Sequence, residues 1–349
     1  MKRLDLILLL AAAALIILSR GYTPGITDKS IVHAVGIDKA EGGYSVTLQL
    51  FKPEAAGADT PVDISKANFK NITADGRDVR QCLSELSQKA GGELFLGHLQ
   101  LIVIGEGVSF GSPEEIFAPF REDKSIYPGV YLAAAKNAGE IVSFPIKENA
   151  VTAENYRRIL DNAASGGGAL LSRLVDIDNR LYELGAAAMP YLELSGEKEQ
   201  RCLTVRGSRI LGQSGFFEGE VSREEGAALS LLRSTPEAAF PERRVFLNGS
   251  ELTVSKSTAT VSFSQSKGQQ RCRVTLKLKA KDIPGGSEEA LEKTLASALD
   301  KYLRQRHTDL TDMSAQLRLW HPKLYAKYKN RLYELWESTE LDVSVSFYS

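Results

Sequence analysis

The four histidines are the side chains most able to bind a metal or to move a proton near neutral pH, and they are His33, His98, His307 and His321. No two of them lie three or four residues apart, as two ligands on one helix face would. None lies beside a cysteine pair, as in a zinc finger. The sequence therefore predicts no metal site and no cofactor.

Nucleophilic and phosphate chemistry also lack a matching motif. Residues 165–168 (SGGG) have the composition of a phosphate loop, but the lysine and hydroxyl residue of a P-loop do not follow them. The chain has no G-x-S-x-G elbow. Asp176 and Asp178 are two residues apart, so on a helix they would point to different sides and could not work as an acid and base pair. We predict that the protein is not an enzyme.

Basic and aromatic residues alternate in residues 320–336 (WHPKLYAKYKNRLYELW). Such a pattern can bind single-stranded nucleic acid or an anionic membrane surface. We favour an ordinary amphipathic helix that turns Leu324, Tyr328, Leu332 and Leu335 inward and leaves the lysines in solvent. The chain has 43 Lys and Arg against 44 Asp and Glu, so no overall basic field attracts nucleic acid, and we expect no nucleic-acid partner.

The first 20 residues carry the features of an export signal. Lys2 and Arg3 precede an apolar run at residues 6–18 (LILLLAAAALIIL). As a helix this run is about 20 Å long, so it would cross a hydrocarbon core of about 30 Å only with thinning of the bilayer or snorkelling of the flanking cations. The small-residue cleavage pattern occurs only inside the run. We predict an uncleaved signal or anchor segment at residues 1–20 and an extracytoplasmic body.

The three cysteines, Cys82, Cys202 and Cys272, are too few and too scattered for a disulfide framework. At least one of them must stay unpaired in a monomer. We expect all three to be small buried hydrophobic residues.

Strand and helix patterns alternate in the first half of the chain. Residues 30–51 read as a hairpin with a turn at the glycine pair, residues 75–90 as a helix, and residues 99–104 and 130–135 as strands. From residue 137 to about 194 the pattern is mainly helical. The loop SGEKEQ that follows predicts a division into two domains, at residues 24–197 and 200–349.

The second half also mixes helices and strands. Ser222 and Glu225 form a capping box that opens a helix to about residue 234. Residues 272–280 alternate strictly between apolar and polar, residues 287–306 have the pattern of a long amphipathic helix, and the chain ends in an alternating strand at 341–347. The fold class predicted is α+β: two mixed domains, each with mixed or antiparallel sheets flanked by helices, after the N-terminal anchor.

Three segments together resemble one family. Residues 31–39 (IVHAVGIDK) resemble the opening "AIGIDK" strand of the Ger(x)C family of spore germination proteins, the GerAC-like C subunits of germinant receptors. Residues 94–106 (LFLGHLQLIVIGE) are similar to the family's "YLGHLKVIVIGE" segment, and residues 320–336 with the last strand resemble its closing segment. Within these motifs we single out Gly36, Asp38, Gly97 and His98. We expect them to be structural: the glycines allow close backbone approach or an unusual dihedral angle, and the carboxylate caps the amides of a turn.

The resemblance implies a non-enzymatic subunit that acts in nutrient-triggered spore germination. Its expected partners are the membrane-embedded A- and B-type receptor subunits and the membrane itself, at the outer face of the inner spore membrane. Members of the family usually carry a lipobox cysteine just after the apolar run. This chain has no cysteine before Cys82, so the uncleaved anchor would replace the lipid.

Two other classes of protein remain as alternatives. An extracytoplasmic solute-binding protein would need a pocket between two α/β lobes, and strands of parallel sheets are continuously apolar, whereas most strands predicted here are amphipathic. A cell-wall hydrolase would need a constellation of carboxylates or a nucleophile, and the sequence shows none.

Overall fold

The computed structural model describes most of the chain after its first 28 residues. The described residues are 29–52, 68–145, 152–197, 201–232, 243–247, 250–266, 269–281, 283–306, 308–329 and 331–348. The anchor predicted at residues 1–20 lies outside them. Within these ranges, every helix is too short or too polar to cross a bilayer.

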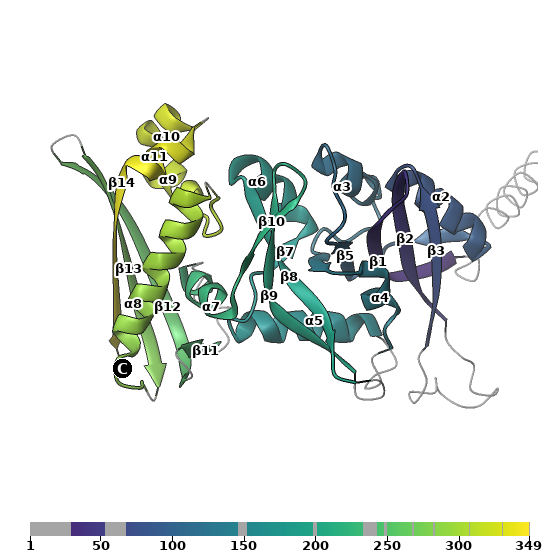
Figure 1. Cartoon of the computed structure of the whole chain (residues 1–349), viewed down its shortest axis with the longest axis horizontal. Helices are drawn as coiled ribbons and strands as arrows, with labels where there is room; N and C mark the ends of the chain where they lie inside the picture. The colour runs from purple at the N-terminus through teal and green to yellow at the C-terminus, as the bar shows by residue number, and fades with distance from the viewer. Residues whose placement is uncertain are drawn as a thin grey trace, which may run out of the picture.

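A mixed sheet of ten strands forms the first part of the molecule (Figure 1). Its strands in spatial order are β10 (Phe217–Val221), β9 (Cys202–Gly212), β8 (Ala186–Ser195), β6 (Tyr131–Ala135), β5 (Leu101–Gly105), β1 (Lys29–Ala40), β2 (Gly43–Phe51) and β3 (Phe69–Gly76), with β4 (Glu93–Phe95) beside β1 and β7 (Ser172–Arg173) beside β6. The predicted hairpin is present as β1 and β2, which pair antiparallel.

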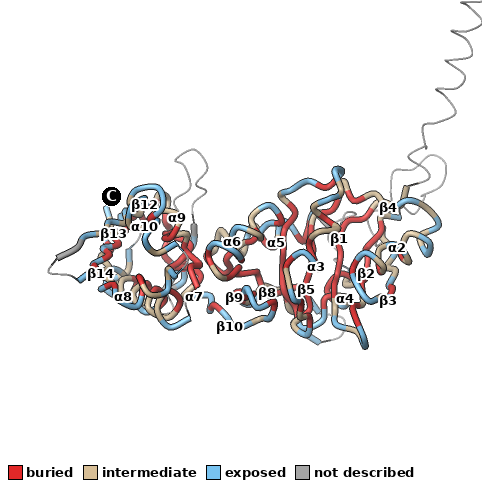
Figure 2. The backbone as a smooth tube through the Cα atoms, turned by 90° about the horizontal axis from the view of Figure 1, so that it is seen from above, coloured by how far each residue is buried: buried red, intermediate tan, exposed pale blue. Residues whose placement is uncertain are grey.

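The centre of this sheet is parallel, through β1, β5, β6 and β8. β5 and β6 are buried along their whole length, because helices cover both faces, and the part of the molecule around β5 is mostly red in Figure 2. Their sequences, LIVIG and YLAAA, are the continuous apolar runs that such strands require. The prediction of a mixed sheet is confirmed, whereas the view that most strands are amphipathic is wrong for the centre of the sheet.

Two layers of helices cover the sheet. On one face α2 (Val79–Ala90), α3 (Pro113–Glu122) and α6 (Ile177–Glu183) pack against the apolar side chains of β1, β2, β5 and β6. On the other face lie α4 (Ala138–Ser143) and α5 (Thr152–Ser165). The sheet therefore has a separate core on each side.

The second sheet has four strands, β11 (Arg243–Leu247), β12 (Ser250–Ser266), β13 (Gln269–Lys281) and β14 (Thr339–Tyr348). β13 alternates between buried and exposed residues as predicted, with its apolar face toward α8 (Ser287–Leu299). A π-helical segment (Asp300–Gln305) extends α8, and α9 (Met313–Trp320), α10 (Pro322–Tyr328) and α11 (Leu332–Ser338) lead to β14. β14 runs parallel to β13.

Helix α7 (Arg223–Leu232) lies between the two sheets. Its residues from Gly226 to Leu232 are all buried, and they share one apolar cluster with Ile210 of β9 and Leu276 of β13. The predicted capping box is present, since the backbone N–H of Ser222 donates to Glu225 and the N–H of Glu225 donates to the Ser222 hydroxyl. The two sheets are therefore joined by a continuous apolar core.

The residues between 195 and 202 connect β8 to β9, which pair antiparallel with Ser195 opposite Cys202. The hydrogen bonds of the first sheet thus continue past the loop at which the sequence predicted a division into domains, and the position of that division stays a prediction.

The prediction of mainly helical structure up to residue 194 is wrong at β8. The alanines of β8 have high helix propensity, but burial between neighbouring strands decides their conformation.

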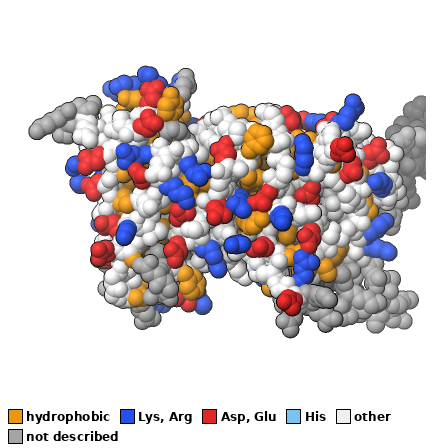
Figure 3. Space-filling model, viewed as in Figure 1, with side chains coloured by type: hydrophobic (Ala, Val, Ile, Leu, Met, Phe, Trp, Pro, Cys, Tyr) orange, Lys and Arg blue, Asp and Glu red, His pale blue; other side chains and the backbone are white. Residues whose placement is uncertain are grey.

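The surface carries both signs of charge. Acidic and basic side chains are interspersed over the face shown in Figure 3, in agreement with the net charge of −1.

Cys82 and Cys272 are buried as predicted, and burial raises the pKa of their thiols to about 11 and about 12. Cys202 is exposed, so the prediction is wrong for this residue, which lies where β9 begins.

We predict that Phe117→Ala lowers the free energy of unfolding by about 3–5 kcal/mol, because the ring is fully buried and packs edge-on against Phe110. Urea titration of the full-length protein in mild detergent measures the change. Tyr127→Ala is the matched control: its ring is 68% exposed, so we expect a change within about 0.5 kcal/mol. Equal losses in the two variants would contradict the assignment of the first core.

Candidate functional site

Asp38 ties the first motif to helix α4, which begins a hundred residues later in the chain. Its carboxylate accepts hydrogen bonds from the backbone N–H groups of Ala138 (2.8 Å) and Gly139 (2.7 Å). The Asn137 side chain accepts a third, from the N–H of Glu140 at 2.9 Å. A helix N-terminus leaves its first N–H groups unpaired and carries partial positive charge, so an anionic acceptor stabilises it.

Two glycines make this contact possible. A Cβ atom on Gly36 would lie 2.8 Å from the carbonyl carbon of Ala138, and one on Gly105 would lie 2.2 Å from Oδ1 of Asp38. α4 can therefore approach β1 closely only where β1 has no side chain. Gly105 belongs to the second motif, and sequence reasoning did not single it out, although the glycine that ends a buried strand was the available signal.

The other end of α4 is also held by buried side chains. Gln49 of β2 donates to the carbonyl of Val142 at 2.7 Å, and the hydroxyl of Tyr156 in α5 donates to the carbonyl of Ile141 at 2.8 Å. Tyr156 is fully buried, and burial raises the pKa of its phenol above the usual range. Both ends of this short helix are thus fixed by residues from other elements. Sequence reasoning did not single out Gln49 or Tyr156.

Gly97 and His98 lie on a turn between β4 and β5. Gly97 does not have a positive φ, and a Cβ there would lie 2.5 Å from the ring of Phe95. The His98 side chain is exposed, with its ring against the Phe95 ring at a centroid distance of 5.8 Å. The strand predicted at residues 99–104 begins two residues later, as β5, so His98 lies on the turn rather than directly before the strand.

His33 is the buried histidine of this region. It is 8% exposed, and its ring packs on Phe51 at a centroid distance of 5.3 Å. Burial, and secondarily the charge of His98, lower the pKa of His33 to about 4. The imidazole is therefore neutral at pH 7.

The structure does not bring the four motif residues into one site. β1 pairs with β4 at Ile31 and with β5 at Ile37, so Gly97 and His98 lie near the start of β1 and Asp38 lies near its end. At about 3.3 Å per residue, the seven residues from Ile31 to Asp38 span about 23 Å. That these residues are structural rather than signalling residues stays a prediction.

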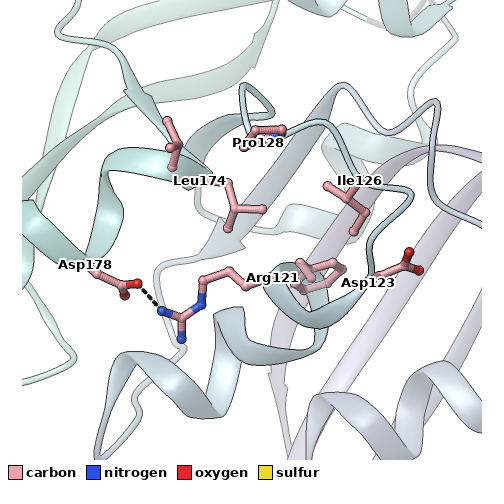
Figure 4. A pocket seen from close by; sticks show the side chains of 8 residues that line it. Arg121, Asp123, Ile126, Pro128, Leu174 and Asp178 are labelled. Atoms are coloured by element: carbon pink, nitrogen blue, oxygen red, sulfur yellow. Dashed lines mark hydrogen bonds and ion pairs between the residues drawn. The ribbon is translucent and has the colours of Figure 1, made fainter.

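A small hollow lies between α3 and α6 (Figure 4). It has a volume of about 240 Å³, and Phe120, Ile126, Pro128 and Leu174 supply its apolar wall. Arg121 donates to Asp178, and the two side chains point toward one another in Figure 4. The hollow is smaller than most ligand sites, which run from about 300 Å³.

Within the described residues, no group of three or more His, Cys, Asp or Glu side chains could hold a metal ion. His33 and His98 are neighbours, whereas His321 packs on Phe263 in the other half of the molecule. His307 lies outside the described residues. What the geometry offers here is a rigid junction between α4 and β1.

Comparison with known proteins identifies the family. Residues 24–194 match the family model described as "Spore germination protein N-terminal domain". Residues 24–194 of this chain are a GerAC-like spore germination protein N-terminal domain.

The chain is similar over its length to a curated relative, "Spore germination protein B3" of Bacillus subtilis (strain 168), with 19% identity across 92% of this chain and 91% of that protein. Among solved structures it is similar to the one titled "Crystal Structure of the GerBC protein", with 18% identity, a TM-score of 0.49, and coverage of 90% of this chain and 97% of that one. The family-model match contains the first two motif segments and confirms the resemblance to the Ger(x)C family. Asp38, Gly105 and α4 all lie within the matched domain of this spore germination protein.

We predict that Asp38→Ala destabilises the protein by about 2–3 kcal/mol, because it leaves two backbone N–H groups at the start of α4 without an acceptor. Asp38→Asn keeps one oxygen acceptor and should lose about half as much. Asp75→Ala, at an exposed position on β3, should change the free energy of unfolding by less than about 0.5 kcal/mol. A loss for Asp38→Ala no larger than that of this control would rule out the capping role.

The depressed pKa of His33 predicts an acid-sensitive stability. The folded pKa of about 4 lies below the usual histidine pKa of 6.5, so between these values the unfolded chain binds more protons and stability falls as pH falls. From pH 7 to pH 5 this linkage removes about 2 kcal/mol. His33→Gln does not titrate here, so its unfolding free energy should fall by that much less over the same interval. Identical pH slopes for the two proteins would contradict the prediction.

Proposed function

We propose that this spore germination protein is a non-enzymatic subunit of a germinant receptor, and that it acts in nutrient-triggered germination by assembling with membrane-embedded A- and B-type receptor subunits. The match of its N-terminal domain to the spore germination family is the observation that carries the proposal. We further propose that an uncleaved segment at residues 1–20 holds the body on the outer face of the inner spore membrane.

The structure is compatible with a role in binding rather than in catalysis. Both sheets are covered by packed helices, and α4 is fixed at both ends by side chains from β1, β2 and α5. Such a body presents surfaces of fixed shape to a partner, which is what a stable protein interface requires. A solute-binding protein would need continuously apolar parallel strands, and the centre of the first sheet has them. The family match nevertheless favours the receptor subunit.

We predict that a tagged copy of this chain co-purifies with both membrane subunits from detergent-solubilised spore membranes. Asp38→Ala should reduce that recovery, since it loosens α4 from β1. His98→Gln should leave both recovery and the germination rate in nutrient unchanged. The His98 ring is exposed, and Phe95 is the one described aromatic residue that it contacts.

Two results would contradict the proposal. Recovery of the chain without either subunit, under conditions in which the two subunits recover one another, would exclude assembly. Hydrolysis of peptidoglycan by the purified protein would make it an enzyme. An intact complex that no longer germinates in the His98→Gln spores would instead assign His98 a signalling role.

A further inference from the structure

The segment from α9 to α10 is the one sequence motif that the proposed function does not explain. No acidic residue lies between Asp312 and Glu334, although the chain as a whole has 44 acidic and 43 basic residues. The cations in this interval are Arg318, Lys323, Lys327, Lys329 and Arg331. The motif thus concentrates positive charge in an otherwise balanced chain.

The same segment exposes two large hydrophobic side chains. Leu319 is 71% exposed and Trp320 is 73% exposed, which makes them the two most exposed large hydrophobic residues of the described chain. They end α9, whose buried residues Met313 and Leu317 lie on its inner face. An isolated exposed leucine is ordinary, but adjacent Leu and Trp side chains beside a cationic helix have the composition of a membrane-interface segment.

α10 projects from the body rather than packing into it. Pro322 begins a new helix directly after α9, and His321 between them has a non-helical backbone. α10 has no buried residue, so the expectation that Leu324 and Tyr328 turn fully inward is wrong, since both are only half-buried. Figure 3 shows Lys and Arg side chains with hydrophobic ones beside them at the tip where Figure 1 places α10.

The lysines of this tip are available to an external anion. Arg318 pairs with Glu183 at 2.9 Å and Arg331 pairs with Glu334 at 3.2 Å. For Lys323 and Lys327, the described part of the chain shows no ion pair, and Nζ of Lys327 lies 5.0 Å from the Tyr328 ring centroid. A surface that fits this tip must accept two apolar side chains and bring negative charge to the lysines beside them.

We infer that the tip formed by the end of α9 and by α10 docks on an anionic lipid surface, with Leu319 and Trp320 in the interface and Lys323 and Lys327 at the headgroups. This inference rests on the proposed placement of the protein at a membrane. Trp prefers the headgroup level of a bilayer, and a lysine near an anionic leaflet is attracted to it. The tip lies at the opposite end of the long axis from the start of β1 (Figure 1), so contact at both ends would lay the body along the membrane.

The chain has two tryptophans, and Trp336 is 2% exposed, so the part of the fluorescence that lipid-borne quenchers can reach comes from Trp320. The protein is reconstituted into vesicles of phosphatidylcholine alone or with 30% phosphatidylserine, each containing doxyl-labelled phosphatidylcholine. We expect doxyl quenching and a blue shift only in the anionic vesicles, and their reversal at high salt. Trp320→Phe should abolish the lipid response and leave the Trp336 signal unchanged.

Two double variants test the charge requirement. Lys323→Gln with Lys327→Gln should lower the docking equilibrium constant about thirtyfold, since each lysine near an anionic surface contributes about 1 kcal/mol. Lys277→Gln with Lys279→Gln, on the exposed face of β13, removes the same charge elsewhere and should leave quenching intact.

Trp320 that is unquenched in anionic vesicles, or equally quenched in both kinds, would overturn the inference. A change in Trp320 emission that appears only when the receptor subunits are added would make the tip a protein interface, and it would overturn the inference too. The vesicles contain no receptor subunits, so the vesicle test and the co-purification test can fail independently. Failure of the vesicle test overturns lipid docking alone, and failure of co-purification overturns assembly alone.

Discussion

The contact between the Asp38 carboxylate and the first N–H groups of α4 fixes the layout of the first sheet. Without an acceptor, the start of a helix packed on buried strands would leave backbone donors unpaired, at about 1–3 kcal/mol each. Gly36 and Gly105 remove the side chains that would keep the helix and the carboxylate apart. β1, β5 and the start of α4 therefore meet at one point. This contact requires glycine at positions 36 and 105 and an acceptor side chain at position 38.

A second junction has a different physical basis. α7 is held between the two sheets by apolar burial, in contact with β9 of the first sheet and with β11 and β12 of the second. Its charged residues lie in the first turn, where Glu225 also accepts from Lys301 and from the hydroxyl of Tyr302. Polar contacts thus set the position at which α7 begins, and the hydrophobic effect holds the two sheets together.

The parts of the fold that were predictable from sequence are those in which one face of an element is buried. The alternation in β13, the amphipathic α8 and the capping box at Ser222 all follow from local periodicity or local hydrogen bonding. β8 was not predictable in this way, because its alanines become a strand only between β6 and β9.

The same distinction applies to the motif residues. Asp38 was recognisable as a carboxylate that caps amides, but the partner amides lie a hundred residues away, and no local pattern indicates them. Gln49 escaped notice because it occupies a polar position in an alternating strand, which indicates a solvent-facing side chain, and Tyr156 because charged and polar residues surround it in the sequence. The strand after His98 was predicted two residues too early, because an apolar run does not show how many residues of turn precede the strand.

The parallel pairing of β14 with β13 imposes an order on how the protein can be completed. The crossover that returns the chain from β13 to β14 runs through α8 to α11. The strands of the first sheet are all present once residue 221 has been synthesised, whereas the second sheet gains β14 only with residues 339–348. Until then α8 can cover the apolar face of β13, but the edge of β13 that pairs with β14 stays open. A chain cut before residue 339 would keep that edge unpaired, and an open strand edge can pair with another chain.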